Sequence, residues 1–304
     1  MFNSLTPWRH KRIARSTTIA SVAVAASATL ALAGGAVAHD YRPVPPPPTN
    51  PTSADQIQNI GQVSSAIKAY YGDTLMTDSN GTQVYDPVTT DGKDVPLHTF
   101  SPDSAYVHEM SGIERSAERY LAAHGDRKGH GRAARKAILL DVDDTSLNTY
   151  SYEIYANFGY NPSDNAAFVT DPGFDLPAVP GMPDLAQWAA DHGYAVFFLT
   201  GRPEGQRNGT EQDLTARGYP VVGTGDAENP DNVYLKNDTG QSWITCDTTG
   251  DNTCTTTERK SETRKHIEAL GYDIVANFGD QYSDLNGGYA DRTYKLPNPM
   301  YYLP

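Results

Sequence analysis

Cysteine is scarce in this sequence of 304 residues, which contains only Cys246 and Cys254. Both lie in one polar stretch rich in Thr, Asp, Asn and Gly, and no histidine stands beside them. A metal site would need more ligands than this pair offers. In an exported protein, the pair is therefore expected to close a small loop through a disulfide.

Long apolar runs are also scarce, and the only one that approaches the length of a membrane span lies between Thr18 and Ala36. Basic residues precede this run, and the small-residue pattern Ala36-Val37-Ala38 ends it. This order is typical of a signal peptide, so we predict that residues 1–38 are cleaved off after Ala38 and that the protein is secreted. An uncleaved membrane anchor is the alternative. The basic residues are Arg9, Lys11, Arg12 and Arg15.

Positive charge is in short supply, with 24 Lys and Arg against 37 Asp and Glu. Residues 1–38 hold four of the basic residues and no acidic ones, so the mature chain would keep 20 against 37, a net charge of −17. Such a surface repels polyanions, which excludes nucleic acid polymers and anionic membranes as main partners. No stable membrane association is expected after cleavage, and a small phosphorylated substrate would need a locally positive site. The oligomeric state stays open.

Several catalytic signatures are missing. The sequence has no G-x-x-x-x-G-K-[ST], which excludes a P-loop kinase, and no G-x-S-x-G, which leaves no support for a serine hydrolase. None of its eight histidines lies in an R-H-G motif, so a histidine phosphatase has no support either.

The N-terminal third predicts a linker followed by two helices. Residues 39–54 are rich in proline and form a stiff linker, and the folded domain is expected over residues 55–304. Ser53-x-x-Gln56 matches a capping box and is followed by apolar residues at helical spacing. A second helix is predicted to begin at Ser101-Pro102. We interpret both helices as an elaboration that packs on a core.

The remainder alternates apolar runs with helical stretches. This alternation predicts an α/β fold with a doubly wound parallel sheet and helices on both of its faces. The expected strands are Ala137–Val142, Tyr194–Leu199, Val221–Val222, Val233–Leu235 and Asp273–Phe278. The expected helices are Pro183–His192, Pro203–Arg217 and about Thr257–Leu270.

Polar motifs follow the expected strands at the edge where such sheets bind ligands. The first strand leads into Asp141-Val-Asp143-Asp144-Thr145, and the second into Thr200-Gly201-Arg202. Lys260 opens a later helix, and the last strand leads into Gly279-Asp280-Gln-Tyr-Ser-Asp284. Each motif is commonplace by itself, but their order and their positions at strand ends are not.

Together these groups suit phosphoryl transfer. A carboxylate can attack phosphorus, and a second acid two residues later can protonate the leaving oxygen and then activate water. Carboxylates from two strand ends offer Mg²⁺ the oxygen ligands that it prefers. A hydroxyl and an ammonium group can hold the remaining phosphate oxygens.

The four motifs resemble those of the haloacid dehalogenase superfamily. More narrowly, LLDVDDTSL, FFLTGRPE, RKSETR and NFGDQYSDL resemble the class B and plant-type acid phosphatase family, over roughly residues 100–304. The resemblance implies a haloacid dehalogenase-like core and a secreted acid phosphatase that hydrolyses small phosphate monoesters through an aspartyl-phosphate.

The resemblance also implies catalytic and phosphate-binding roles. Asp141 would be the nucleophile, and Asp143 the general acid and base. Phosphate or substrate would bind at Thr200-Gly201-Arg202 and at Lys260. Lys236 follows another expected strand and is a rival for the lysine role, but Lys260 is preferred because K-S-x-x-R frames it.

By the same resemblance, four aspartates would form the Mg²⁺ site. Asp141 and Asp280 would be direct ligands, Asp143 would contribute its main-chain carbonyl, and Asp284 would act through water or through Lys260.

Between the first two motifs, about residues 146–193 form an insertion, which in this superfamily makes a cap over the site. Its aromatic residues are interpreted as the core of the cap, with the alternative that one or two stack on a leaving group. These residues are Tyr150, Tyr152, Tyr155, Phe158, Tyr160, Phe168 and Phe174.

Other functions stay open or are excluded by single positions. An EF-hand is excluded because Ser146 and Tyr152 stand where its loop needs Gly and Glu. A storage-like protein that binds metal or phosphate without turnover could share the fold. A preference for nucleotides, or transfer of phosphate to alcohols, would use the same residues.

Overall fold

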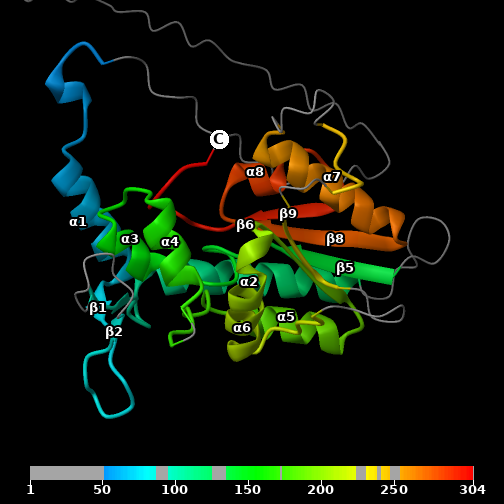
Figure 1. Ribbon diagram of the computed structural model, residues 1–304, viewed down its shortest axis with the longest axis horizontal. Helices are drawn as coiled ribbons and strands as arrows, with labels where there is room; N and C mark the ends of the chain where they lie inside the picture. Colours follow the sequence, from blue (N-terminus) through cyan, green and yellow to red (C-terminus); the bar gives the residue numbers. More distant parts are fainter. Residues whose placement is uncertain are drawn as a thin grey trace, which may run out of the picture. The chain divides into compact units, whose positions relative to one another are not determined.

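A five-stranded sheet in the order β7-β6-β5-β8-β9 lies at the centre of the structure, and every neighbouring pair in it is parallel (Figure 1). The computed structural model describes residues 51–86, 95–124, 135–171, 173–223, 231–237, 241–246 and 254–303. The strands are β5 (Arg135–Leu140), β6 (Ala195–Pro203), β7 (Val233–Lys236), β8 (Tyr272–Gly279) and β9 (Arg292–Lys295). The predicted signal peptide lies outside the described residues.

The topology places a switch point beside β5. From this central strand the chain moves outward through β6 and β7, and then returns to the other side of β5 to form β8 and β9. Loops that leave β5 and β8 therefore diverge at their carboxyl ends, where open α/β sheets bind ligands. The main-chain N–H of Asp141 donates to the carbonyl of Phe278 at 3.0 Å, which holds the end of β5 against β8.

Eight α-helices lie in the described part of the chain. They are α1 (Ile60–Tyr71), α2 (Ala105–His124), α3 (Tyr150–Tyr155), α4 (Pro162–Val169), α5 (Met182–Asp191), α6 (Arg207–Ala216), α7 (Thr256–Ala269) and α8 (Tyr282–Leu285). Short 3₁₀ turns cover Ala54–Gln56 and Glu204–Gln206. Two small antiparallel pairs join β1 (Thr74–Leu75) to β4 (His98–Thr99) and β2 (Tyr85–Asp86) to β3 (Val95–Pro96).

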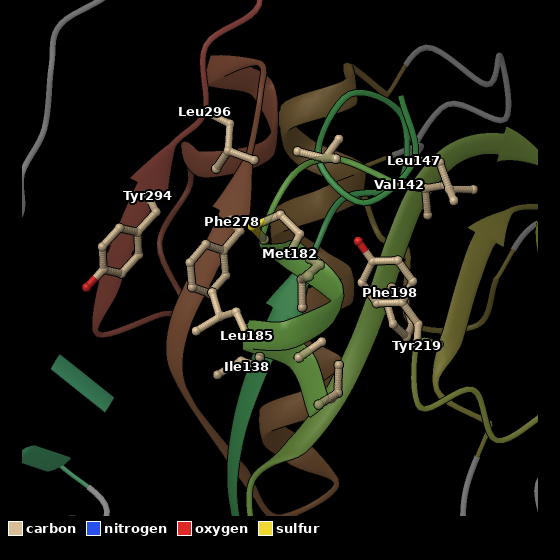
Figure 2. Close-up of a cluster of buried hydrophobic side chains, with 14 of the residues drawn as sticks. Ile138, Val142, Leu147, Met182, Leu185, Phe198, Tyr219, Phe278, Tyr294 and Leu296 are labelled. Atoms are coloured by element: carbon tan, nitrogen blue, oxygen red, sulfur yellow. The ribbon is translucent and has the colours of Figure 1, made fainter. Parts of the chain in front are cut away.

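Helices cover both faces of the sheet, as the sequence predicts (Figure 1). Alternate residues of β5 point to opposite faces, so Ile138 and Leu140 pack in the core under α2 and α5, whereas Leu139 packs under α7. Figure 2 shows the larger core, in which Ile138, Phe198 and Phe278 come from three neighbouring strands. The two cores bury the sheet on both sides, and its strands read as apolar runs for that reason.

Three predictions for secondary structure are wrong, and one strand was missed. Helix α2 begins at Ala105 and not at Ser101-Pro102, because the side chain of Ser104 accepts from the Val107 N–H. The first helix begins at Ile60 because the Asn59 side chain accepts from the Gly61 N–H at 3.0 Å, whereas Gln56 accepts from the Thr52 N–H instead of completing a capping box. Residues 221–222 form no strand, since the Val222 N–H donates to a side chain, that of Asn232. Strand β9 was not predicted, because its sequence RTYK has no apolar run.

The predicted disulfide between Cys246 and Cys254 is present, with 5.5 Å between the two Cα atoms. It stands directly before α7, which starts with a capping box between Thr255 and Glu258. Glu262, on the next turn of α7, accepts hydrogen bonds from Thr245 and from the Cys246 N–H. The disulfide loop is therefore tied to the helix that carries Lys260. Among the described helices, none has the length and apolar character needed to cross a bilayer.

Candidate active site

All eight residues predicted for catalysis, substrate and metal lie around one cavity of about 450 Å³ at the carboxyl ends of β5, β6 and β8. The predicted cysteines lie elsewhere. The eight are Asp141, Asp143, Thr200, Gly201, Arg202, Lys260, Asp280 and Asp284. The rival lysine, Lys236, closes β7 and does not line this cavity.

The turn after β5 is held by its own backbone and side chains. The Ser146 hydroxyl donates to the Asp141 carbonyl at 2.7 Å, and the N–H groups of Ser146 and Leu147 both donate to the Val142 carbonyl. Asp144 adopts a positive φ of 54°, an uncommon conformation for a residue with a side chain. Such a conformation persists when contacts with the surrounding structure hold it in place. The backbone of Asp144 then sets the directions of the neighbouring side chains.

Lys260 joins the turn after β5 to the loop after β8. Its ammonium donates to Asp141 Oδ1 at 2.5 Å and to Asp284 Oδ1 at 2.6 Å, and only 5% of the residue is exposed. Burial alone would lower the pKa of Lys260, but the two carboxylates outweigh burial and raise it above its ordinary value. The ammonium is therefore charged beside Asp141 at neutral and acidic pH.

The loop after β8 needs a glycine. A Cβ at Gly279 would lie 2.3 Å from the Cβ of Asp284, so no larger residue fits without moving this acid. The Gln281 N–H donates to Asp284 Oδ2 at 2.9 Å, and the Thr145 hydroxyl donates to Asp280 Oδ1 at 3.2 Å. Burial, followed by the charge of Asp284, raises the pKa of Asp280 to about 7.

Asp141, Asp280 and Asp284 form a group that could hold a metal ion. One carboxylate oxygen from each lies within 4.8 Å of the others, and all three residues are buried. Burial raises the pKa of Asp141 well above its usual range, and Lys260 opposes this effect. One ammonium group cannot balance three buried carboxylates, so the group has the charge and the oxygen donors that a hard divalent cation needs.

Asp143 is not part of this group, and its carboxylate binds Arg202. The guanidinium donates to Asp143 Oδ1 at 2.6 Å through Nη2 and to Oδ2 at 3.1 Å through Nε. Its Nη1 donates to the Val169 carbonyl and to the Thr210 hydroxyl, so the arginine is fixed from both sides. The Asp143 side chain is 30% exposed, which leaves it open to the cavity.

The insertion between β5 and β6 supplies one wall of the cavity through Phe158 and Tyr160. Tyr152 and Phe168, in contrast, are fully buried and contact each other with ring centroids 5.6 Å apart. Aromatic residues of this insertion therefore divide between a small core and the rim of the cavity. Tyr160 is 75% exposed and is available to a ligand.

Glu153, Asp144 and Tyr301, at or next to the cavity, are among the residues to which the sequence assigned no role. Glu153 of α3 is 7% exposed, and burial, followed by the charge of Asp143, raises its pKa to about 7. Asp144 is 1% exposed and accepts hydrogen bonds from the Thr149 N–H and hydroxyl. Tyr301, far along the chain, donates to Asp144 Oδ2 at 2.9 Å. Of the three, only Asp144 stands in a motif that the sequence analysis singled out, the stretch Asp141-Val-Asp143-Asp144.

Asp213 of α6 lies behind Arg202 and gives a pH-dependent contribution to stability. Burial raises its pKa to about 7, although Arg202 and the Leu176 N–H oppose this effect. The folded state thus binds the Asp213 proton more tightly than the unfolded state, so its contribution is full below about pH 4 and is lost as the pH rises through about 7.

Replacing Asp213 by asparagine should remove this loss. The compared quantity is the unfolding free energy of Asp213→Asn minus that of the wild type. We expect this difference to be roughly 1–3 kcal/mol larger at pH 8 than at pH 4.5. Urea unfolding of both proteins at the two pH values measures this, and other titrating groups cancel in the comparison. An equal difference at both pH values would show that Asp213 titrates normally.

The parallel sheet, the acidic turn after its central strand and the buried lysine from α7 define a haloacid dehalogenase-like protein. The model of the family "HAD superfamily, subfamily IIIB (Acid phosphatase)" matches residues 95–304, and the chain belongs to this family.

Individual proteins show the same likeness. The chain is 32% identical over 177 residues to acid phosphatase 1 of Solanum lycopersicum, covering 57% of this chain and 61% of that protein. It is 31% identical over 175 residues to vegetative storage protein 2 of Arabidopsis thaliana, covering 55% and 56%. The matched part thus spans about three fifths of these relatives. The structure of the class C acid phosphatase from Bacillus anthracis aligns with a TM-score of 0.47 at 19% identity, covering 64% of this chain and 80% of that chain.

Proposed function

We propose that this protein is a Mg²⁺-dependent acid phosphatase that hydrolyses small phosphate monoesters through an aspartyl-phosphate at Asp141. The observation that carries the proposal is the buried ammonium of Lys260, which bridges Asp141 and Asp284 at the edge of one cavity. A lysine in this place draws an anionic phosphate towards a carboxylate that would otherwise repel it.

In the first step, an Asp141 carboxylate oxygen attacks phosphorus and the bond to the ester oxygen breaks. Asp143 donates its proton to that oxygen, which leaves as an alcohol. In the second step, Asp143 takes a proton from water while the water oxygen attacks phosphorus. The bond between phosphorus and Asp141 breaks, and inorganic phosphate leaves. Arg202 holds Asp143 facing the cavity in both steps.

Thr200, Gly201 and Lys260 are proposed to hold the phosphate oxygens. All three line the cavity, and they approach it from β6 and α7. The Thr200 hydroxyl oxygen accepts from the Arg202 N–H at 3.1 Å, so its proton is free to point towards an anion. A preorganised set of this kind stabilises charge that develops on the transferred phosphoryl group.

The donor set fits Mg²⁺. Asp141 and Asp280 would be direct ligands, the main-chain carbonyl of Asp143 would complete the protein ligands, and Asp284 would act through Lys260 or water. When bound, the ion supplies positive charge that offsets the charge of the phosphate and of the carboxylates. Without it, the carboxyl groups of Asp141, Asp280 and Asp284 lie close together, and Lys260 bonds to two of the three.

Small monoesters fit the cavity and the charge of the chain. A volume of about 450 Å³ accommodates a phosphate with a modest leaving group, and Phe158 and Tyr160 offer that group an apolar rim. The excess of acidic residues disfavours polymers. We further propose secretion after cleavage at Ala38, a linker over 39–54 and a phosphatase domain over 55–304 with a cap near 146–193. The disulfide next to α7 supports an oxidising destination.

A storage-like protein without turnover is the second candidate, and the similarity to vegetative storage protein 2 favours it. The presence of Asp141, Asp143 and Lys260 around one cavity favours the enzyme. A single assay separates the two candidates.

We expect residues 39–304 to hydrolyse p-nitrophenyl phosphate in Mg²⁺, with a rate that falls at least about 100-fold in EDTA and returns when Mg²⁺ is restored. The rate is measured from about pH 4 to 8, so that the result does not depend on the choice of a single pH. Full activity in EDTA would exclude the metal, and a folded, Mg²⁺-loaded protein that is inactive at every pH would support the storage-like candidate.

A further inference from the structure

The chain that follows β9 returns to the active-site cavity. Residues 298–303, here called the 298–303 segment, place Tyr301, Tyr302 and Leu303 on the wall of the cavity that also contains Asp141. Met300 is buried within the main core, so the segment is anchored by packing against the rest of the domain.

Both ends of the segment contact the loop after β8. The Asn298 amide donates to Asp280 Oδ2 at 2.7 Å, and its oxygen accepts from the Met300 N–H at 2.9 Å. Gln281 donates to the same Asp280 oxygen at 2.6 Å and accepts from the Leu303 N–H at 3.0 Å. Both donors to Asp280 Oδ2 are therefore fixed by main-chain groups of the segment.

Its middle holds the turn after β5. The Tyr301 hydroxyl donates to Asp144 Oδ2 at 2.9 Å, and the Thr149 hydroxyl donates to the same oxygen at 2.6 Å. The other carboxylate oxygen accepts from the Thr149 N–H at 3.0 Å. Asp144 is the buried residue with positive φ in the turn that carries Asp141 and Asp143. Of its three donors, only Tyr301 comes from outside the turn and the start of α3.

We propose that Tyr301 is a positioning residue for the nucleophile. Its hydroxyl fixes Asp144, and Asp144 in turn holds the strained turn that aims Asp141 and Asp143 into the cavity. Through Asn298 and Tyr301, the 298–303 segment binds the loops after β8 and β5 to each other. An uncommon backbone conformation needs such external contacts, because a free turn would relax to a lower energy. This inference rests on the proposed phosphatase activity.

Tyr301→Phe tests the proposal, because it removes the hydroxyl and keeps the ring that lines the cavity. We expect kcat for p-nitrophenyl phosphate to fall about tenfold, since a hydrogen bond to the buried Asp144 carboxyl group is lost at a site that sets the attack geometry. KM, and inhibition by inorganic phosphate, should stay within about twofold of the wild type, because the groups that bind phosphate are unchanged.

Tyr194→Phe is the matched control. Tyr194 is a buried tyrosine and Tyr301 a partly buried one, and the Tyr194 hydroxyl donates to the Leu121 carbonyl at 2.8 Å, but Tyr194 does not line the cavity. Both variants should lose some thermal stability, and only Tyr301→Phe should lose kcat. Equal kcat losses in the two variants would mean that destabilisation alone explains the effect, and the proposal would be wrong.

A double-mutant cycle tests whether Tyr301 acts through Asp144. The kcat of Tyr301→Phe/Asp144→Ala should be close to that of Asp144→Ala alone, because alanine leaves the Tyr301 hydroxyl no acceptor at this position. The proposal would be contradicted if the loss of kcat in the double variant equalled the product of the losses in the two single variants. A Tyr301→Phe enzyme with wild-type kcat would contradict it as well. An inactive wild type would overturn the proposed function and this inference together, whereas an active wild type that tolerates Tyr301→Phe would overturn this inference alone.

Discussion

Asp141→Asn is expected to abolish the hydrolysis of p-nitrophenyl phosphate, with kcat at least about 10⁴-fold below the wild type. The amide keeps the shape of the side chain but cannot act as an anionic nucleophile. It can still accept a hydrogen bond from Lys260, so the fold around it should persist. The readout is the initial rate at saturating substrate in Mg²⁺, together with the circular dichroism and melting temperature of both proteins.

The matched control for this variant is Asp191→Asn. Asp191 ends α5 on the exposed surface, where its carboxylate accepts from Gln187, and it does not line the cavity. This variant should keep the wild-type rate, which shows that the loss of one acid is harmless elsewhere. If Asp141→Asn keeps more than about a hundredth of the activity while folded, another group is the nucleophile.

Lys260→Met should have the second largest effect, lowering kcat by about 10²–10³-fold. Methionine fills a similar volume but removes the charge that offsets Asp141, Asp284 and the incoming phosphate. The variant should also unfold more easily in the absence of Mg²⁺, by about 3–5 kcal/mol, because Asp141 and Asp284 lose the buried ammonium that bridges them. Adding Mg²⁺ should recover more stability in this variant than in the wild type.

Lys236→Met provides the comparison, since Lys236 ends β7 and lies outside the cavity lining. We expect it to keep kcat within about twofold of the wild type. Rates and urea unfolding curves, each with Mg²⁺ and with EDTA, measure both effects. A Lys260→Met enzyme with normal kcat, or a Lys236→Met enzyme without activity, would reverse the assignment of the lysine.

The strand ends of this fold could be predicted from the sequence because the sheet is buried on both faces. Burial demands apolar runs, and polar residues that follow such runs must lie at one edge of a parallel sheet. Asp141, Thr200 and Asp280 were found in this way. Strand β9 was missed because an edge strand with the sequence RTYK carries no such signal.

Contacts between distant polar residues could not be predicted. Tyr301 donates to a residue 157 positions earlier in the chain, and no local pattern indicates such a partner. Glu153 reads as an ordinary helix residue, and only the packing of α3 against the cavity buries it. The capping box predicted at Ser53 is absent for a related reason. The side chain of Asn59 caps the N-terminus of α1 instead.

Arg202 illustrates how a structure refines a role. Its position after Thr200 suggested substrate binding, yet its guanidinium is committed to Asp143, Val169 and Thr210. We therefore interpret it as the group that keeps Asp143 turned to the cavity, at the edge of any substrate site.

The central claim is that phosphate is transferred first to Asp141, and trapping the phosphoenzyme tests it most directly. In Asp143→Asn, the departure of p-nitrophenolate needs no proton, whereas the attack of water loses its base, so the phosphoenzyme should accumulate. The enzyme is mixed with p-nitrophenyl phosphate, quenched in acid, and its mass and peptides are measured. One phosphoryl group on Asp141, absent from Asp141→Asn, is the predicted result. Release of p-nitrophenol without a phosphorylated protein, or a phosphoryl group on another residue, would contradict the mechanism.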